Sequence, residues 1–177
     1  MKKEFDTRRR HYTLCILVQD IPGVLSQVAR LFSRKGYNIE SIVTGATDRP
    51  GITRLSIELI GDEQMITQIA AQCRKLLPVQ AVKVLDAERS VRREIALVKI
   101  RTRDRDAREG AIQIANIFKA KIIDICRDSL TISVFGEPVK NAALIDTLAD
   151  FEILEIAKGG TIAMERGPGT IYQELED

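Results

Sequence analysis

The stretch Asp20-Ile21-Pro22-Gly23-Val24-Leu25, followed a helix's length later by Gly36-Tyr37-Asn38-Ile39, decides the fold of the first half of the chain. The apolar run 12–18 before it is typical of a buried strand, and the amphipathic run 24–35 after it is typical of a helix. Its aspartate is a capping residue, its proline is tolerated in a first helical turn, and its glycine lets a ligand approach the backbone. We therefore predict a turn that directs free amides at the positive end of a helix toward one spot, which suits a carboxylate.

Composition places the chain among folded proteins. It has 177 residues, enough for one ordinary domain or two small ones, with 45% hydrophobic and 29% charged residues. The formal net charge of +2 is smaller than nucleic-acid binders usually carry. No apolar run approaches the roughly 20 residues of a membrane span, and the charged N-terminus does not resemble a signal peptide. We expect a cytoplasmic protein that binds neither nucleic acid nor membrane.

Cysteine and histidine usage gives no sign of a catalytic or metal site. Cys15, Cys73 and Cys126 show no metal-ligand spacing, and an odd number gives no disulfide framework. We expect three reduced thiols in the core. The single histidine, His11, has no nucleophile motif to serve and is interpreted as a strand-end residue. No catalytic residue and no metal ligand is predicted.

The order strand, helix, strand, strand, helix, strand occurs twice. The first set comprises strands 12–18, 38–44, 53–60 and 79–85 with helices 24–35 and 61–77. The second set comprises strands 95–100, 122–126, 130–135 and 151–157 with helices 107–119 and 138–148. The segments 55–61 and 130–136 align, and each is followed by an acid and a helix. The sequence predicts an α+β protein of two ferredoxin-like βαββαβ domains.

Domain limits follow from this repeat. We place the domains at 11–86 and 94–165, joined by a charged segment, and expect residues 1–10 and 166–177 to be flexible. Right-handed crossovers put the first and third strands in the middle of each sheet. Strand 53–60 alternates apolar and polar residues, which predicts one wet face. The second strand is a weakly charged edge, so its neighbourhood is predicted to mediate self-association.

The first domain is the candidate for binding a small zwitterion. The amides of Gly23 to Leu25 could hold a carboxylate, Asn38 could hold either end of the ligand, and Asp20 could pair with an ammonium. An aliphatic side chain could be bounded by Ile21, Val24, Leu25, Ile39 and Ile42. The second domain starts its first helix with the charged run 102–106, without proline or glycine, and is not expected to bind in this way. The alternative is that Asp20 only caps, Gly23 only permits the turn and Asn38 only starts a strand.

Two longer stretches carry a family resemblance. Val18–Leu25 and Leu31–Ser41 resemble an ACT domain and, more narrowly, the small regulatory subunit of acetolactate synthase, also called acetohydroxyacid synthase. Further matching pieces are Gly61-Asp62-Glu63, the segment 92–100 and Ile122-Ile123-Asp124. The resemblance extends over about residues 11–165.

The resemblance implies a regulatory subunit without catalytic activity of its own. Its large partner would hold thiamine diphosphate, Mg²⁺ and FAD, condense pyruvate to acetolactate, and be activated by this chain, which itself carries no cofactor. The family's small subunits confer feedback inhibition by valine or another branched-chain amino acid, bound between paired ACT domains of a homodimer, and their C-terminal domain is implicated in contact with the large subunit. Carried over by motif, the effector site comprises Asp20, Ile21, Pro22, Gly23, Val24, Leu25, Asn38 and Ile39. Many members have asparagine in place of Asp20, whose carboxylate would repel the effector's own.

Other function classes have less support. A free-standing ACT-domain sensor or transcriptional regulator is the alternative, although no helix-turn-helix segment is visible. A nucleic-acid-binding sheet lacks the aromatic pattern on its strands. A self-sufficient enzyme lacks a base–nucleophile pair.

Overall fold

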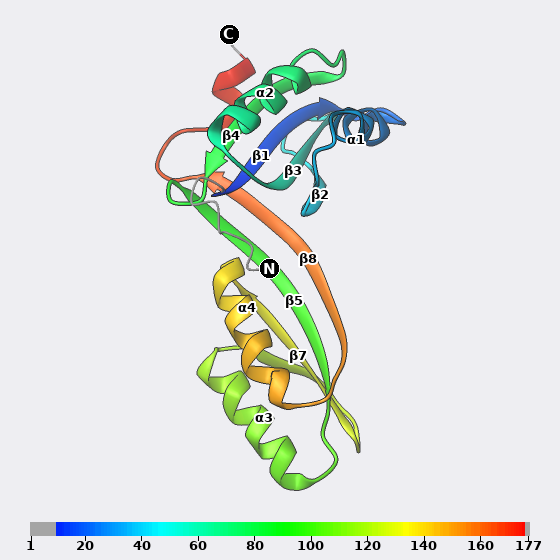
Figure 1. The fold of residues 1–177 in the computed structure, drawn as a ribbon, viewed down its shortest axis with the longest axis vertical. Coiled ribbons are helices and arrows are strands. Elements are labelled where there is room, and N and C mark those ends of the chain that lie inside the picture. Colours follow the sequence, from blue (N-terminus) through cyan, green and yellow to red (C-terminus); the bar gives the residue numbers. More distant parts are fainter. Residues whose placement is uncertain (1–9, 176–177) are drawn as a thin grey trace, which may run out of the picture. The chain divides into compact units, whose positions relative to one another are not determined.

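The computed structural model describes residues 10–175 and divides into two compact units. The first contains the described residues up to Val91 together with those from Thr161 onward, and the second contains Arg92–Gly160. The predicted flexible N-terminus lies outside the described residues apart from Arg10, which begins the first strand. Each unit is built from one sheet with helices packed against it (Figure 1).

The first unit has the predicted βαββαβ order. Its elements are β1 (Arg10–Gln19), α1 (Val24–Lys35), β2 (Ser41–Ala46), β3 (Ile52–Gly61), α2 (Glu63–Cys73) and β4 (Val79–Asp86). The strand order is β2-β3-β1-β4, with β1 and β3 central as predicted. Strand β1 pairs with β3 and with β4, and β2 pairs with β3; each of these pairs is antiparallel.

The core of the first unit lies between one face of the sheet and the two helices. Alternate β1 residues Leu14, Ile16 and Val18 point into it, because successive side chains of a strand face opposite sides. Helix α1 contributes a stripe at helical spacing that includes Val28 and Phe32. The helix ends at Gly36, whose positive φ of 70° allows its amide and that of Tyr37 to bond back to the last turn.

The second unit repeats this architecture. Its elements are β5 (Ser90–Arg101), α3 (Arg105–Ile117), β6 (Lys121–Ile125), β7 (Ser129–Gly136), α4 (Pro138–Thr147), a 3₁₀ turn (Leu148–Asp150) and β8 (Ile153–Glu165). The strand order is β6-β7-β5-β8, equivalent to that of the first sheet. Helices α3 and α4 lie side by side on one face (Figure 1), over a core that includes Val98, Ile132 and Leu144. The prediction of two ferredoxin-like βαββαβ domains is confirmed.

The C-terminal segment corrects the predicted domain limit at 165 and the predicted flexible tail. Residues from Thr161 belong to the first unit, and a 3₁₀ helix, η2 (Ile171–Leu175), packs beside β4 (red in Figure 1). Ala163 and Ile171 are only 2% and 5% exposed. They cover the outer face of the first sheet, where Cys15, Leu17, Ala81 and Leu85 would otherwise expose apolar surface. The tail packs because this face is apolar; residues 176 and 177 lie outside the described part.

The predicted wet face of strand 53–60 is wrong, because polar residues on that face are buried. Ser56 and Glu58 are 3% and 5% exposed. The Arg54 guanidinium donates from Nη2 to the carbonyl of Ala163 at 2.6 Å, which ties β3 to the covering segment. A face with alternating polar residues is therefore buried here.

Smaller differences concern element ends and one thiol. The second strand begins at Ser41 and not at Asn38, and α2 ends at Cys73. Strand β6 ends at Ile125, which leaves Cys126 exposed in the following turn, whereas Cys15 and Cys73 are buried. The expectation of three core thiols is thus wrong for Cys126.

Candidate functional site

The turn between β1 and α1 is held by its neighbours and not by a side-chain cap. The Asp20 amide donates to the Gly51 carbonyl at 2.8 Å, and the Ile21 amide donates to Gln19 at 3.0 Å. The N-cap position of α1 is Gly23, in the left-handed region at φ 83°, and no side chain of residues 10–175 caps the helix start. The predicted capping by Asp20 is therefore wrong, and Pro22 precedes the helix and does not lie in its first turn.

Several amides at this helix start remain available. The Val24 amide donates to the Ile21 carbonyl at 3.3 Å, and the Gln27 amide to the Gly23 carbonyl at 3.1 Å. Among residues 10–175, no hydrogen-bond acceptor is found for the amides of Gly23, Leu25 and Ser26. The start of a helix attracts anions because such amides and the helix dipole act together. The arrangement suits a carboxylate, although the Val24 amide is already engaged.

The side chains at the turn offer both charge and apolar surface. Asp20 is exposed, and Ile21 and Leu25 are 43% and 41% exposed. Val24 points into the core and is 8% exposed, so its side chain does not line the outside of the turn. The turn therefore presents an acid and two aliphatic groups beside the open amides.

Asn38 and Ile39 lie elsewhere. The Asn38 side-chain amide donates to the Glu40 carboxylate at 2.7 Å, and Ile39 is half-buried against the first core. A hollow of about 300 Å³ at this place is lined by Gly36, Tyr37, Asn38, Glu40, Ile60 and Met65. This hollow combines an amide, a carboxylate and a phenol ring with aliphatic groups.

Strand register shows that the turn and Asn38 are at opposite ends of the sheet. Ser41 pairs with Glu58, which pairs with Thr13, whereas the turn follows Gln19. Six residues of strand separate Thr13 from Gln19, or about 20 Å at 3.3 Å per residue. Within one chain, the structure brings Asp20 to Leu25 together but does not bring Asn38 and Ile39 to them.

One part of the site was not predicted from the sequence. The hairpin loop 47–51 between β2 and β3 holds the turn through the Gly51 carbonyl. Within it, the Thr47 hydroxyl bonds to the carbonyls of Arg49 and Ile52 at 3.1 and 2.9 Å. The sequence Asp48-Arg49-Pro50-Gly51 marks a hairpin loop, but nothing local in it indicates a contact with Asp20.

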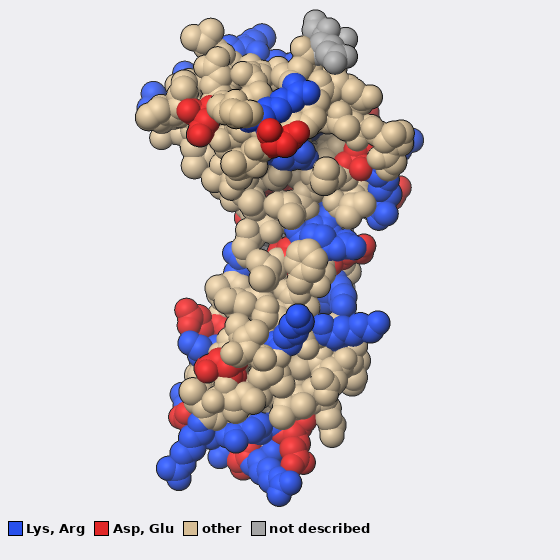
Figure 2. All heavy atoms as spheres, turned by 180° about the vertical axis from the view of Figure 1, so that it is seen from behind, with Lys and Arg blue, Asp and Glu red and all other residues tan. Residues whose placement is uncertain are grey.

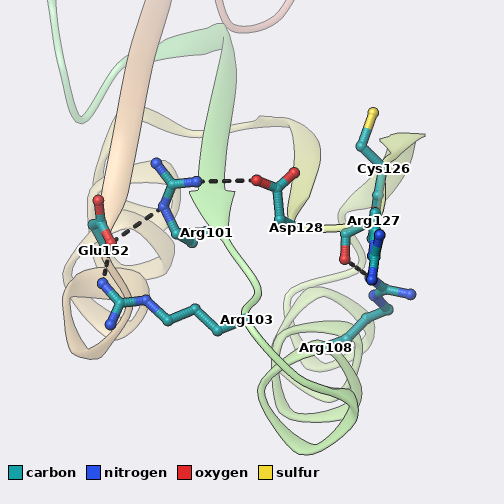
Figure 3. A network of polar contacts seen from close by, with 7 residues as sticks. All are labelled: Arg101, Arg103, Arg108, Cys126, Arg127, Asp128 and Glu152. Carbon is teal, nitrogen blue, oxygen red and sulfur yellow. Dashed lines mark hydrogen bonds and ion pairs between the residues drawn. The ribbon is translucent and has the colours of Figure 1, made fainter.

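The equivalent helix start in the second unit is occupied by charged side chains. The Asp104 carboxylate accepts from the Ala107 amide at 2.8 Å and so caps α3. Around it, Arg101 pairs with Asp128 and Glu152, at 3.2 and 3.3 Å, and Arg103 pairs with Glu152 at 2.8 Å (Figure 3).

An arginine of helix α3 binds the turn between β6 and β7 at the same end of the second unit. The Arg108 guanidinium donates to the carbonyls of Cys126 and Arg127 (Figure 3). Basic and acidic side chains are interleaved over this end of the second unit in Figure 2. The cap and the ion pairs give this turn a different surface from the open amides of the first unit.

Two buried cysteine thiols have raised pKa values. Burial raises the pKa of the Cys73 thiol to about 12, and burial also raises the pKa of Cys15 although the Arg54 guanidinium lies 3.1 Å from its sulfur. Among the described residues, no three His, Cys, Asp or Glu side chains gather as a metal site would require. No described helix has the length and apolar character needed to cross a membrane.

Comparisons with known proteins cover almost the whole chain. Residues 14–81 match the model of the AHAS small subunit-like ACT domain, and residues 93–167 match that of the small subunit of acetolactate synthase. The acetolactate synthase small subunit of Mycolicibacterium smegmatis is 40% identical over 157 residues, covering 89% of this chain and 92% of that one. The chain belongs to the acetolactate synthase small subunit family.

Further relatives support this membership. A probable acetolactate synthase small subunit of Methanothermobacter thermautotrophicus is 39% identical over 160 residues, covering 90% of this chain and 95% of that one. The crystal structure of the acetolactate synthase small subunit from Thermotoga maritima superposes with a TM-score of 0.80 at 38% identity, covering 90% of this chain and 99% of that one. This member of the family therefore shares both the fold and the length of its relatives.

Proposed function

We propose that this chain is a cytoplasmic regulatory subunit of acetolactate synthase. It activates the large catalytic subunit and makes it sensitive to feedback inhibition by valine or another branched-chain amino acid. Thiamine diphosphate, Mg²⁺ and FAD belong to the catalytic subunit in this proposal, and this chain contributes no catalytic residue. Family membership along nearly the full length of the chain is the observation that carries the proposal.

The turn supplies the chemistry for one end of the effector. The open amides of Gly23 and Leu25 receive the carboxylate, and exposed Ile21 and Leu25 contact the aliphatic side chain. The Asp20 carboxylate pairs with the ammonium of the effector. It does not contact the effector's carboxylate, because two anionic groups repel each other. One methylene in such a pocket is worth about 1–3 kcal/mol, so valine, leucine and isoleucine are separated only modestly.

A second copy of the chain completes this site. In the described part of the chain, strand β2 pairs with β3 only, so its outer side is an open edge. A two-fold axis that pairs two β2 strands antiparallel sets the start of one β2 beside the end of the other. Asn38 comes just before the start of β2. Ala46, at the end of β2, pairs with Thr53, and Thr53 pairs with Val18, which comes just before the turn. The dimer therefore brings Asn38 and Ile39 of one copy toward residues 20–25 of the other.

Regulation follows as a population shift. An effector bound between two first units favours one mutual arrangement of the copies, and the second units carry that preference to the catalytic subunit. The effector acts only to the extent that it binds the two arrangements with different affinity.

Reconstitution with the catalytic subunit tests the proposal. The purified chain should raise acetolactate production by its cognate catalytic subunit, and valine should then lower the rate. The catalytic subunit alone, with and without valine, is the control. An unchanged rate in every mixture would refute the assignment, and valine binding by the isolated chain in that case would favour a free-standing sensor.

A further inference from the structure

The C-terminal tail (Thr161–Leu175) reaches the hairpin loop 47–51. The Tyr172 hydroxyl donates to the Asp48 carboxylate. The Arg49 guanidinium carbon lies 4.1 Å from the centroid of the Tyr172 ring, within the range of a cation–π contact. One tail side chain thus holds two adjacent loop residues by two different interactions.

The loop in turn holds the turn before α1. Thr47 closes the loop on itself through the Arg49 and Ile52 carbonyls, and the Ile52 amide donates to the Arg49 carbonyl at 3.2 Å. The carbonyl of Gly51, the residue before Ile52, accepts from the Asp20 amide at 2.8 Å. Three consecutive contacts therefore connect Tyr172 to Asp20, although the two residues are far apart in sequence.

The tail is anchored firmly enough to fix the position of Tyr172. The preceding side chain, Ile171, is 5% exposed and packs against the apolar cluster on the outer face of the first sheet. The Lys83 ammonium pairs with Glu165 at 2.5 Å and donates to the Thr170 carbonyl at 3.1 Å. The tail is held on both sides of residues 166–169, so the ring is presented to the loop in one place.

We propose that Tyr172 is a positioning residue, which orders the hairpin loop through Asp48 and Arg49 and thereby fixes the Asp20–Gly23 turn in the conformation that leaves its amides open. The C-terminal tail then sets the affinity of that turn for its carboxylate ligand. The part of this inference that concerns affinity rests on the proposed effector site.

The ionisation of the pair agrees with this role. The hydrogen bond from Tyr172 lowers the pKa of Asp48, and the Asp48 carboxylate raises the pKa of Tyr172. The link therefore joins an ionised acceptor to a protonated donor throughout the neutral pH range, the stronger kind of hydrogen bond.

Amide hydrogen exchange on the full chain tests the positioning role without any ligand. Tyr172→Phe keeps the ring beneath Arg49 and removes the hydrogen bond, and Asp48→Ala removes it from the other side. Each substitution should speed exchange of the Asp20 amide by about fivefold to tenfold. The double variant should exchange little faster than either single variant, because both single substitutions remove the same hydrogen bond. Asp48→Asn keeps an acceptor for the hydroxyl and should restore most of the protection.

Leu175→Ala is the matched control. Leu175 also packs against the apolar cluster beneath the tail. Its truncation should lower the melting temperature yet leave exchange of the Asp20 amide unchanged relative to the amides of β1. If Tyr172→Phe and Asp48→Ala leave the Asp20 amide as protected as in the wild type, or if all β1 amides exchange faster together, the positioning role is wrong.

Calorimetric titration with valine tests the consequence for affinity. Tyr172→Phe should weaken valine binding several-fold, whereas Leu175→Ala should bind as the wild type does. Equal affinities for all three chains would overturn the link between tail and effector site. A wild type that does not bind valine would refute the proposed effector, and the exchange measurement would still decide whether Tyr172 positions the turn.

Discussion

Gly23 and Gly36 bracket helix α1, and both have left-handed backbone, with φ of 83° and 70°. A Cβ added at either position would meet no atom within 4 Å, so the only cost of a side chain is the backbone strain. Their surroundings differ in function, because Gly23 lies in the proposed effector turn and Gly36 ends the helix. The two glycines therefore form a matched pair for separating stability from binding.

Alanine at either glycine should lower the free energy of unfolding by about 1–2 kcal/mol, the cost of a left-handed alanine. Gly23→Ala should in addition weaken valine binding strongly, because relief of the strain reorients the open amides. Gly36→Ala should weaken binding much less, because Gly36 lies near Asn38 and not in the turn whose amides hold the carboxylate. Denaturant titration and calorimetry measure the two effects, and equal valine affinities in both variants would argue against the turn as the binding site.

At this scale the sequence predicted the turn but not its partners. Gly23 and the adjacent proline are local signals of a strand-to-helix turn, and α1 has the bounds that its apolar spacing predicts. The separation of Asn38 from the turn depends on the register of two strand pairs. The contact of Tyr172 with Asp48 joins residues 124 positions apart. Neither the separation nor the contact can be recognised from neighbouring residues in the sequence.

The helices differ in how they begin. Helices α2 and α3 start with aspartates, where Asp62 accepts from the Met65 amide at 2.7 Å and Asp104 accepts from the Ala107 amide at 2.8 Å. Helix α1 starts with a glycine and no side-chain cap. Each aspartate satisfies one amide of its own helix, whereas the start of α1 leaves amides for a ligand. Helix α4 also lacks a side-chain cap, but it begins with Pro138, which has no amide hydrogen to offer.

Removing the Asp104 cap should destabilise the second unit. Asp104→Ala leaves the Ala107 amide without its acceptor and should cost about 1 kcal/mol, whereas Asp104→Ser keeps a capping oxygen and should stay near the wild type. Denaturant titration measures the cost, and faster amide exchange in the first turn of α3 locates it. Equal stability of the alanine and serine variants would show that the cap contributes nothing.

The sequence of strand β1 indicates that both faces of the first sheet are covered. It is apolar on both faces, and a sheet with helices on one face only must cover the other face with something else. The covering segment itself is inconspicuous, because its glycines and Pro168 are typical of a linker. The need for a cover is thus visible in the sequence, but its identity is not.

For the whole molecule, the proposed dimer depends on the β2 edge. Ile42 is 36% exposed on this strand and pairs with buried Ile57, so it lies on the helix side of the sheet at the predicted interface. Leu77, at 96% exposed, lies far along the chain from β2, in the segment after α2, and serves as a comparison.

Ile42→Asp should produce a monomer, because an antiparallel β2 pair would bury an unpaired carboxylate from each copy. Its valine affinity should fall with dimerisation, since Asn38 then no longer meets the turn of a second copy. Leu77→Asp should remain dimeric and bind valine normally. Analytical ultracentrifugation and calorimetry measure both properties, and a dimeric Ile42→Asp chain would rule out pairing through β2.

The return of Thr161–Leu175 to the first unit has a consequence for biosynthesis. A ribosome releases β1 to β4 early, but the segment that shields Leu17 and Leu85 is translated only after the second unit. The unit that is translated first is therefore completed only after the second unit, and its apolar outer face stays exposed until residues 161–175 have been made. A stop codon placed just before Thr161 should consequently yield an aggregating polypeptide, because the apolar outer face of the first sheet then has no cover, although the core of the second unit is encoded upstream.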